Sequence, residues 1–156
     1  MVDAATVIAN FISGIILSEA TIPQYWAQWG TLTSGETSVG TIGDSIFVGP
    51  VRPESDVIPA NSIFIAAYDS DSEKTFDNKS ETVDYSVNIN VRAKHTTDSR
   101  QYAFLKAAII YDFLQREELT GYLDISGIIT PVQLAYDEQN NAVFSLNASL
   151  KHHDEY

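Results

Sequence analysis

Apolar and polar residues alternate strictly over residues 82–95, which is the longest regular pattern in the chain. The apolar members are Val83, Tyr85, Val87, Ile89, Val91 and Ala93; the polar positions between them include Asp84, Arg92 and Lys94. A repeat of two predicts a long strand with one buried face and one polar face. A strand covered on both faces would be apolar throughout, so we expect this one in an antiparallel sheet or at a sheet edge.

Two segments carry the three- and four-residue spacing of amphipathic helices. The first covers residues 3–18, where Asp3 is a short hydrogen-bond acceptor at the N-cap position. The second begins at Thr97 or Asp98 and extends to about residues 115–118. Its apolar stripe consists of Tyr102, Leu105, Ile109 and Phe113.

Shorter apolar runs predict four more strands. Residues 45–49 and 62–68 are rich in β-branched and aromatic side chains and are bounded by turn formers. Near the end of the chain, residues 128–136 and 142–151 flank a run of Asp, Glu, Gln and Asn at 137–141. This arrangement predicts a closing β-hairpin.

The remaining segments are polar. Residues 21–44 contain several Gly, Ser and Thr residues and are expected to form an irregular linker or insertion. Within it, Trp26 and Trp29 either cover the core in a short helix or form an exposed anchor for a partner; the high average burial of tryptophan favours the core. Residues 69–81 are expected to form a solvated acidic loop, and residues 152–156 a solvated C-terminal tail.

This order of elements predicts an α+β fold, with a mainly antiparallel sheet and two helices packed on one of its faces. The polar face of the long strand is then left for water or for another subunit. A length of 156 residues is typical of one domain, so we expect residues 1–156 to form a single domain.

Composition removes several classes of function. The chain has no cysteine, which excludes a disulfide framework, cysteine-ligated zinc and a thiol nucleophile. Its net charge of -12 argues against binding duplex nucleic acid by neutralising phosphates. The apolar stretch at residues 7–17 is too short to span a bilayer and no cationic segment precedes it, so we expect neither a membrane span nor a signal peptide.

No catalytic motif stands out, and we expect neither an enzyme nor a cofactor. There is no G-x-S-x-G turn for a serine nucleophile and no glycine-rich phosphate loop. His152 and His153, followed by Asp154 and Glu155, are a candidate metal cluster. Neighbouring residues of a strand point to opposite faces, so the two imidazoles would not converge and a solvated tail is favoured.

The acidic run that begins at Asp69 has the opening pattern of a calcium loop. An EF-hand loop also needs a glycine at its sixth position and a glutamate at its twelfth. Lys74 and Ser80 occupy those positions. We therefore expect no metal site here. An enzyme with carboxylate chemistry that the sequence does not reveal remains an alternative.

Three segments carry a resemblance to a known family. They are YSVNINVRAK at residues 85–94, SRQYA at residues 99–103 with the helix that continues to Leu114, and the hairpin from TPVQL to FSLNA at residues 130–148. With the order of elements, these resemble the tail terminator and tail-completion (minor capsid, neck) proteins of long-tailed bacteriophages. Those are small α+β proteins with an N-terminal helix, a sheet, a second helix after the long strand and a final hairpin.

The resemblance implies a structural virion protein. Such a protein forms a ring, typically a hexamer, at the head-proximal end of the tail, where it stops tube growth and joins the tail to the head connector. Its partners would be further copies of itself, the tail tube protein and the connector, with DNA passing through the lumen. The alternatives are another neck or head-completion component, and an unrelated protein-binding module.

The polar strand face, the acidic segment and the tryptophans are the surfaces that we expect to contact subunits or partners. The candidate residues are Asp69, Asp71, Glu73, Lys74, Asp84, Arg92, Lys94, Trp26 and Trp29. An acidic lumen would repel the phosphates of passing DNA, although plain solubility explains the acidic surplus equally well.

Overall fold

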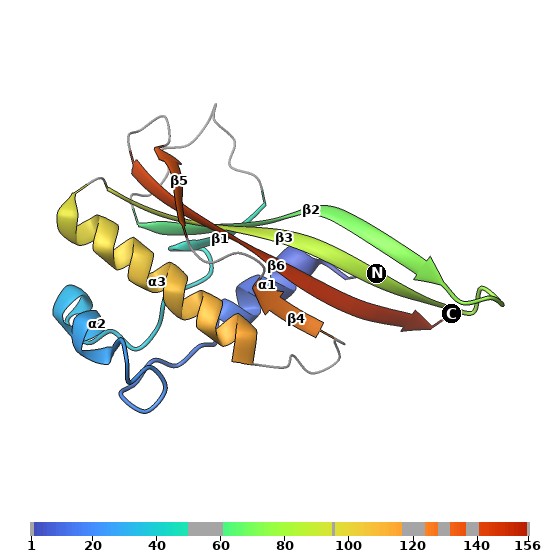
Figure 1. Cartoon of the computed structure of the whole chain (residues 1–156), viewed down its shortest axis with the longest axis horizontal. Coiled ribbons are helices and arrows are strands. Elements are labelled where there is room, and N and C mark those ends of the chain that lie inside the picture. Colours follow the sequence, from blue (N-terminus) through green and yellow to red (C-terminus); the bar gives the residue numbers. More distant parts are fainter. Residues whose placement is uncertain are drawn as a thin grey trace.

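The computed structural model describes residues 2–49, 61–94, 96–116, 124–127, 132–136 and 141–155. Figure 1 shows the helices and strands along the chain. They are α1 (Ala4–Ser13), α2 (Trp26–Thr33), β1 (Ile46–Val48), β2 (Ser62–Lys74), β3 (Ser80–Lys94), α3 (Thr97–Arg116), β4 (Asp124–Gly127), β5 (Val132–Tyr136) and β6 (Asn141–Glu155).

The strands form one six-stranded sheet in the order β1-β2-β3-β6-β4, with β5 also paired to β6. The β1–β2 pair is parallel and the other pairs are antiparallel. The central strands β3 and β6 pair along their whole lengths, from Ser80 opposite Glu155 to Lys94 opposite Asn141. The predicted α+β class and mainly antiparallel sheet are confirmed, as is the strand that alternation predicted over residues 82–95 up to Lys94; residue 95 lies outside the described residues.

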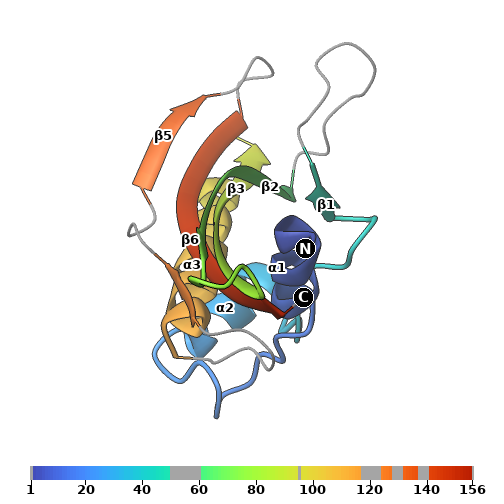
Figure 2. The same cartoon turned by 90° about the vertical axis from the view of Figure 1, so that its right-hand side faces the viewer.

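The core lies on one face of this sheet. Val87, Ile89 and Val91 of β3 are fully buried there. They pair with small or apolar residues of β6, namely Ala148, Leu146 and Phe144. Both α1 and α3 contribute to the same buried cluster, so the prediction of two helices on one face is confirmed. In the end-on view of Figure 2, β2, β3 and β6 curve around α1.

Helix α1 begins where its sequence predicted. The Asp3 carboxylate accepts hydrogen bonds from the backbone N–H of Thr6 at 3.2 Å and from its hydroxyl at 2.7 Å, which satisfies an otherwise free helix-terminal donor. The helix ends at Ser13 rather than near residue 18. Beyond Gly14, Ile15 and Leu17 are buried while Ile16 is exposed, so the apolar pattern there alternates instead of following a helix.

Helix α2 lies within residues 21–44, a segment otherwise expected to be irregular, and it is the short helix in which Trp26 and Trp29 were expected to cover the core. It is only eight residues long and is followed by Ser34, whose φ of 59° is left-handed. Trp29 is fully buried, its indole N–H donates to the carbonyl of Glu36, and its ring lies 5.5 Å from that of Tyr102 in α3. Burial of one large aromatic side chain against α3 thus holds a short helix whose glycine and threonine content gives it little stability alone.

Two segments expected to be irregular are strands. The predicted acidic loop at residues 69–81 is the end of β2, a short turn and the start of β3, and residues 152–155 of the predicted tail continue β6. Most of these side chains are exposed, so no alternation of apolar residues marks them as strands. Strand β4 was not predicted. The closing hairpin is confirmed as β5 and β6, and its connection at residues 137–140 lies outside the described residues.

Candidate functional site

The most prominent surface feature is a β-arm made of the continuations of β2, β3 and β6. We define the arm as residues 68–85 and 150–155. In Figure 1 the arm extends past α3 and β4 to one end of the molecule. Its base is tied to the body by the chain start, because the backbone N–H of Val2 donates to the Tyr85 hydroxyl at 3.4 Å. An element of this length is more than the core requires, and it exposes a large polar surface.

A β-bulge decides which way the acidic side chains point. The β2–β3 register shifts between Ala67 and Asp69, so one extra residue, the exposed Tyr68, interrupts the alternation. Without the bulge, Asp69, Asp71 and Glu73 would continue the buried face of β2. With it they pair with Ser86, Asp84 and Thr82 and lie on the polar face of the sheet.

The acidic face of the arm is partly neutralised by β6. Asp71 lies directly opposite Asp84, and like charges in that position repel. Asp84 accepts a hydrogen bond from the Ser149 hydroxyl at 3.0 Å and has the Lys151 ammonium at 4.0 Å. At the next pair, the Thr82 hydroxyl lies 3.1 Å from Nδ1 of His153. The carboxylates contributed by β2 itself face solvent.

The tip of the arm is a tight turn that presents an aromatic ring. The Asp77 carboxylate accepts hydrogen bonds from the Thr75 hydroxyl at 2.7 Å and the Lys79 N–H at 3.1 Å, and Asn78 has a left-handed φ of 57°. These bonds, first that from Thr75, lower the pKa of Asp77. Phe76 is fully exposed, although a phenyl ring in water is unfavourable. The exposed Phe76 ring at the end of the arm is a candidate contact residue, since aromatic side chains are frequent in protein interfaces.

One edge of the arm is open for pairing. Strand β1 pairs with β2 only at Ile63–Ile65. Beyond that point, the edge of β2 that faces away from β3 pairs with no strand of the described residues from Ala66 to Lys74. The backbone N–H and C=O groups of such an edge can accept a strand from another chain.

The other predicted contact residues do not lie in the arm. Arg92 belongs to the polar face of the sheet body, with its guanidinium 4.7 Å from the centre of the Phe64 ring. Lys94 is exposed at the far end of β3. Trp29 is fully buried and cannot form an exposed anchor, whereas Trp26 is half-buried against the core. The sequence prediction of these two tryptophans as contact residues is wrong for Trp29.

The C-terminal histidines lie on β6 rather than in a tail. Nε2 of His152 is 2.9 Å from the Asp154 carboxylate, and Nε2 of His153 is 4.0 Å from that of Glu155. Each pair joins residues i and i+2, which share a strand face, and the two pairs therefore lie on opposite faces. Within the described ranges, no group of three or more His, Asp or Glu side chains could hold a metal ion.

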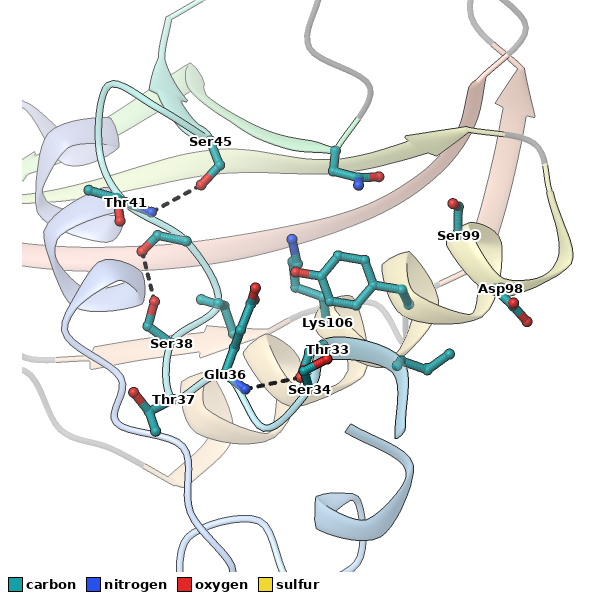
Figure 3. Close-up of a pocket in the computed structure, with 15 residues that line it drawn as sticks. Thr33, Ser34, Glu36, Thr37, Ser38, Thr41, Ser45, Asp98, Ser99 and Lys106 are labelled. Carbon is teal, nitrogen blue, oxygen red and sulfur yellow. Dashed lines mark hydrogen bonds between the residues drawn. The ribbon is translucent and has the colours of Figure 1, made fainter. Parts of the chain in front are cut away.

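A pocket lies at the other end of the molecule, between α3 and the segment from α2 to β1. Its volume is about 800 Å³. Figure 3 shows side chains from residues 33–45 on one side and from the first half of α3 on the other. The lining is dominated by hydroxyls: Thr33, Ser34, Thr37, Ser38, Thr41, Ser45 and Ser99. Its charged members are Glu36, Asp98 and Lys106.

Lys106 is the unusual group in this pocket. The side chain is only 3% exposed, and its ammonium lies 4.2 Å from the centre of the Tyr102 ring. Burial lowers the pKa of Lys106 from 10.5 to about 8, an effect that the nearby Glu36 charge opposes. Burial, followed by the Glu36 charge, raises the pKa of Tyr102 to about 12. The amine is therefore protonated in most molecules at neutral pH.

The sequence contains one signal for this pocket, a lysine within an apolar helix face. Lys106 follows Tyr102 by four residues and precedes Ile109 and Ile110 on α3. It therefore occupies a position in the apolar stripe of the helix, where a lysine is normally avoided. The hydroxyl-rich segment facing it appeared in the sequence only as a linker.

Comparison with models of known protein families and with curated proteins finds no match for this chain. Over the described residues, none of the helices combines the length and the apolar character needed to cross a membrane. The site must therefore be interpreted from its own geometry.

Proposed function

We propose that this chain is a structural virion protein that forms a ring at the head-proximal end of the tail of a long-tailed phage. There it ends growth of the tail tube and joins the tail to the head connector. The ring, of six copies, assembles in the host cytoplasm and becomes part of the neck of the virion. DNA passes through its lumen without specific binding.

The observation that carries this proposal is the β-arm. It extends beyond the helices, presents the exposed Phe76 at its tip, and leaves the edge of β2 open from Ala66 to Lys74. A soluble monomer has little use for an exposed aromatic tip beside an unpaired strand edge, since both favour uncontrolled association. An obligate assembly has a use for both.

The asymmetry of the molecule supports a ring in particular. The arm lies at one end of the long axis, and α2 and the beginning of α3 lie at the other (Figure 1). An arm that contacts a different surface of the next copy gives a heterologous interface, and such interfaces generate closed rings when the rotation between copies permits. The acidic face of the arm also suits a channel through which DNA must slide.

An unrelated protein-binding module is the second candidate, and the arm favours it as well. The two differ in what the arm contacts: another copy of the chain in a ring, or a different protein in a binding module. The burial of Trp29 removes the tryptophan site that this alternative first suggested.

Native mass spectrometry of the purified chain, alone and mixed with tail tube protein, tests the proposal. We expect one closed species of about six copies, either for the chain alone or in the mixture with tail tube protein. Phe76→Ser should reduce its abundance at least tenfold, whereas Ile16→Ser, which removes an exposed apolar side chain outside the arm, should not. A monomer under both conditions would contradict the ring.

A further inference from the structure

The Lys106 ammonium is buried, and the Glu36 carboxylate acts on it without forming an ion pair. Removing a charged amine from water is strongly unfavourable unless hydrogen bonds or an opposite charge replace the lost water. In the part of the chain that the structure describes, no group hydrogen-bonds to this ammonium and no carboxylate forms an ion pair with it. Its one close partner is the face of the Tyr102 ring. Within the described residues, the pocket thus holds a positive charge that neither a hydrogen bond nor an ion pair compensates.

The side chains in front of this charge are ready to donate hydrogen bonds. Among the described residues, the hydroxyls of Ser34, Thr37, Thr41 and Ser99 make no side-chain hydrogen bond. In Figure 3 the Lys106 side chain lies between Glu36 on one side and Ser99 on the other. A cation surrounded by uncommitted hydroxyls is a setting that stabilises an oxygen anion.

We propose that this pocket is a binding site for a carboxylate group, with the Lys106 ammonium as counter-ion and the surrounding Ser and Thr hydroxyls as donors. A monoanion fits better than a phosphate, because the pocket has one cation and also contains Glu36 and Asp98. Those two carboxylates would repel a dianion more strongly than a monoanion. A carboxylate leaves the pair with Lys106 neutral.

The carboxylate has two sources with the same chemistry. One is a small polyhydroxylated acid, whose hydroxyls would pair with the polar lining of a pocket of about 800 Å³. The other is an acidic side chain from the arm of a neighbouring copy, which rests on the proposed ring. The arm lies at one end of the molecule, and α2 and the beginning of α3, which border the pocket, lie toward the other (Figure 1), as head-to-tail contact requires.

Isothermal titration calorimetry with sodium gluconate tests whether the pocket binds a small polyhydroxylated acid, with glucose as the matched neutral probe. We expect the chain to bind gluconate at least ten times more tightly than glucose. Lys106→Met should abolish that preference, while Lys79→Met, at an exposed position of the arm, should retain it. Lys106→Met removes an interior charge and should fold, which circular dichroism checks. Equal gluconate binding by the chain and by Lys106→Met would overturn the pocket as the site.

Mass photometry tests whether the carboxylate comes from the arm of a neighbouring copy. If an arm carboxylate enters the pocket, Lys106→Met should reduce the fraction of chains in rings at least tenfold. Added gluconate should reduce the same fraction for the unaltered chain. Rings that persist in Lys106→Met exclude this source but leave the proposed function intact. If the unaltered chain forms no ring, the proposed function is contradicted. The gluconate titration then still tests whether the pocket binds a carboxylate. If the chain neither binds gluconate nor differs from Lys106→Met in assembly, the carboxylate site is wrong.

Discussion

The body of the sheet and the arm are built from the same three strands, but different forces hold them. In the body, β3 presents Val87, Ile89 and Val91 to two helices, and all three are fully buried. In the arm, β2 is exposed on both faces and pairing with β3 is its main support. Hydrophobic burial stabilises the body, whereas the arm is a strand extension whose own burial is small. The outer part of the arm, where β2 is exposed, therefore adds little to the stability of the monomer.

A charge placed in the body should have the largest effect. Val87→Asp buries an unpaired carboxylate between Ala67 and Ala148, at a cost above about 4 kcal/mol. That is a large part of the stability of a typical domain, so we expect loss of the folded state by circular dichroism. Ser72→Asp, on the same sheet face but in the exposed arm, should change stability by less than about 0.5 kcal/mol. Similar losses in the two variants would erase the contrast.

Lys106, a charge that the body buries, should destabilise the fold by an amount that depends on pH. The pKa of Lys106 falls from 10.5 in the unfolded chain to about 8 in the fold, so between these values the unfolded chain binds the extra proton. Stability therefore rises with pH from about 8 to 10.5, and the charge destabilises the fold by roughly 3 kcal/mol below that window. The other charged residues that line the pocket are Glu36 and Asp98, and burial raises the pKa of Tyr102 to about 12, above this window.

Urea unfolding at pH 7 and at pH 10.5 measures this effect. Lys106→Met should be more stable than the unaltered chain at pH 7, and most of the difference should disappear at pH 10.5. A difference that is constant with pH would mean that the amine is not desolvated in the fold.

Substitution at the arm tip should have the smallest effect on stability. Phe76 is fully exposed, so Phe76→Ser removes no burial and should leave the urea midpoint unchanged within error. The same variant should impair assembly, as described above. A clear loss of monomer stability would show that the Phe76 side chain packs against its own chain, and would weaken the proposal that Phe76 is a contact residue.

The sequence predicted the body well and the arm poorly, for a physical reason. Alternation marks β3, and helical spacing marks α1 and α3, because a core selects apolar residues at fixed intervals. The acidic end of β2 has no such selection, since its strand conformation depends on pairing with β3. Trp29 was uncertain from the sequence because its burial depends on Tyr102, which lies far along the chain.

The pocket was not predicted for a related reason. Its walls come from the segment after α2 and from α3, and their approach is a consequence of tertiary packing. The lysine in the apolar stripe of α3 marks one wall, but only the fold brings the Ser and Thr hydroxyls opposite to it. A linker composition therefore concealed a structured surface.

Hydrogen exchange along the open edge of β2 tests most directly whether the arm is an assembly element. Peptides that cover residues 66–74 should exchange quickly in the monomer, because those amides lack a strand on one side. In the ring their exchange should slow at least tenfold, while peptides from the buried part of β3 stay protected in both states. Unchanged exchange at residues 66–74 in a ring of confirmed mass would contradict the account.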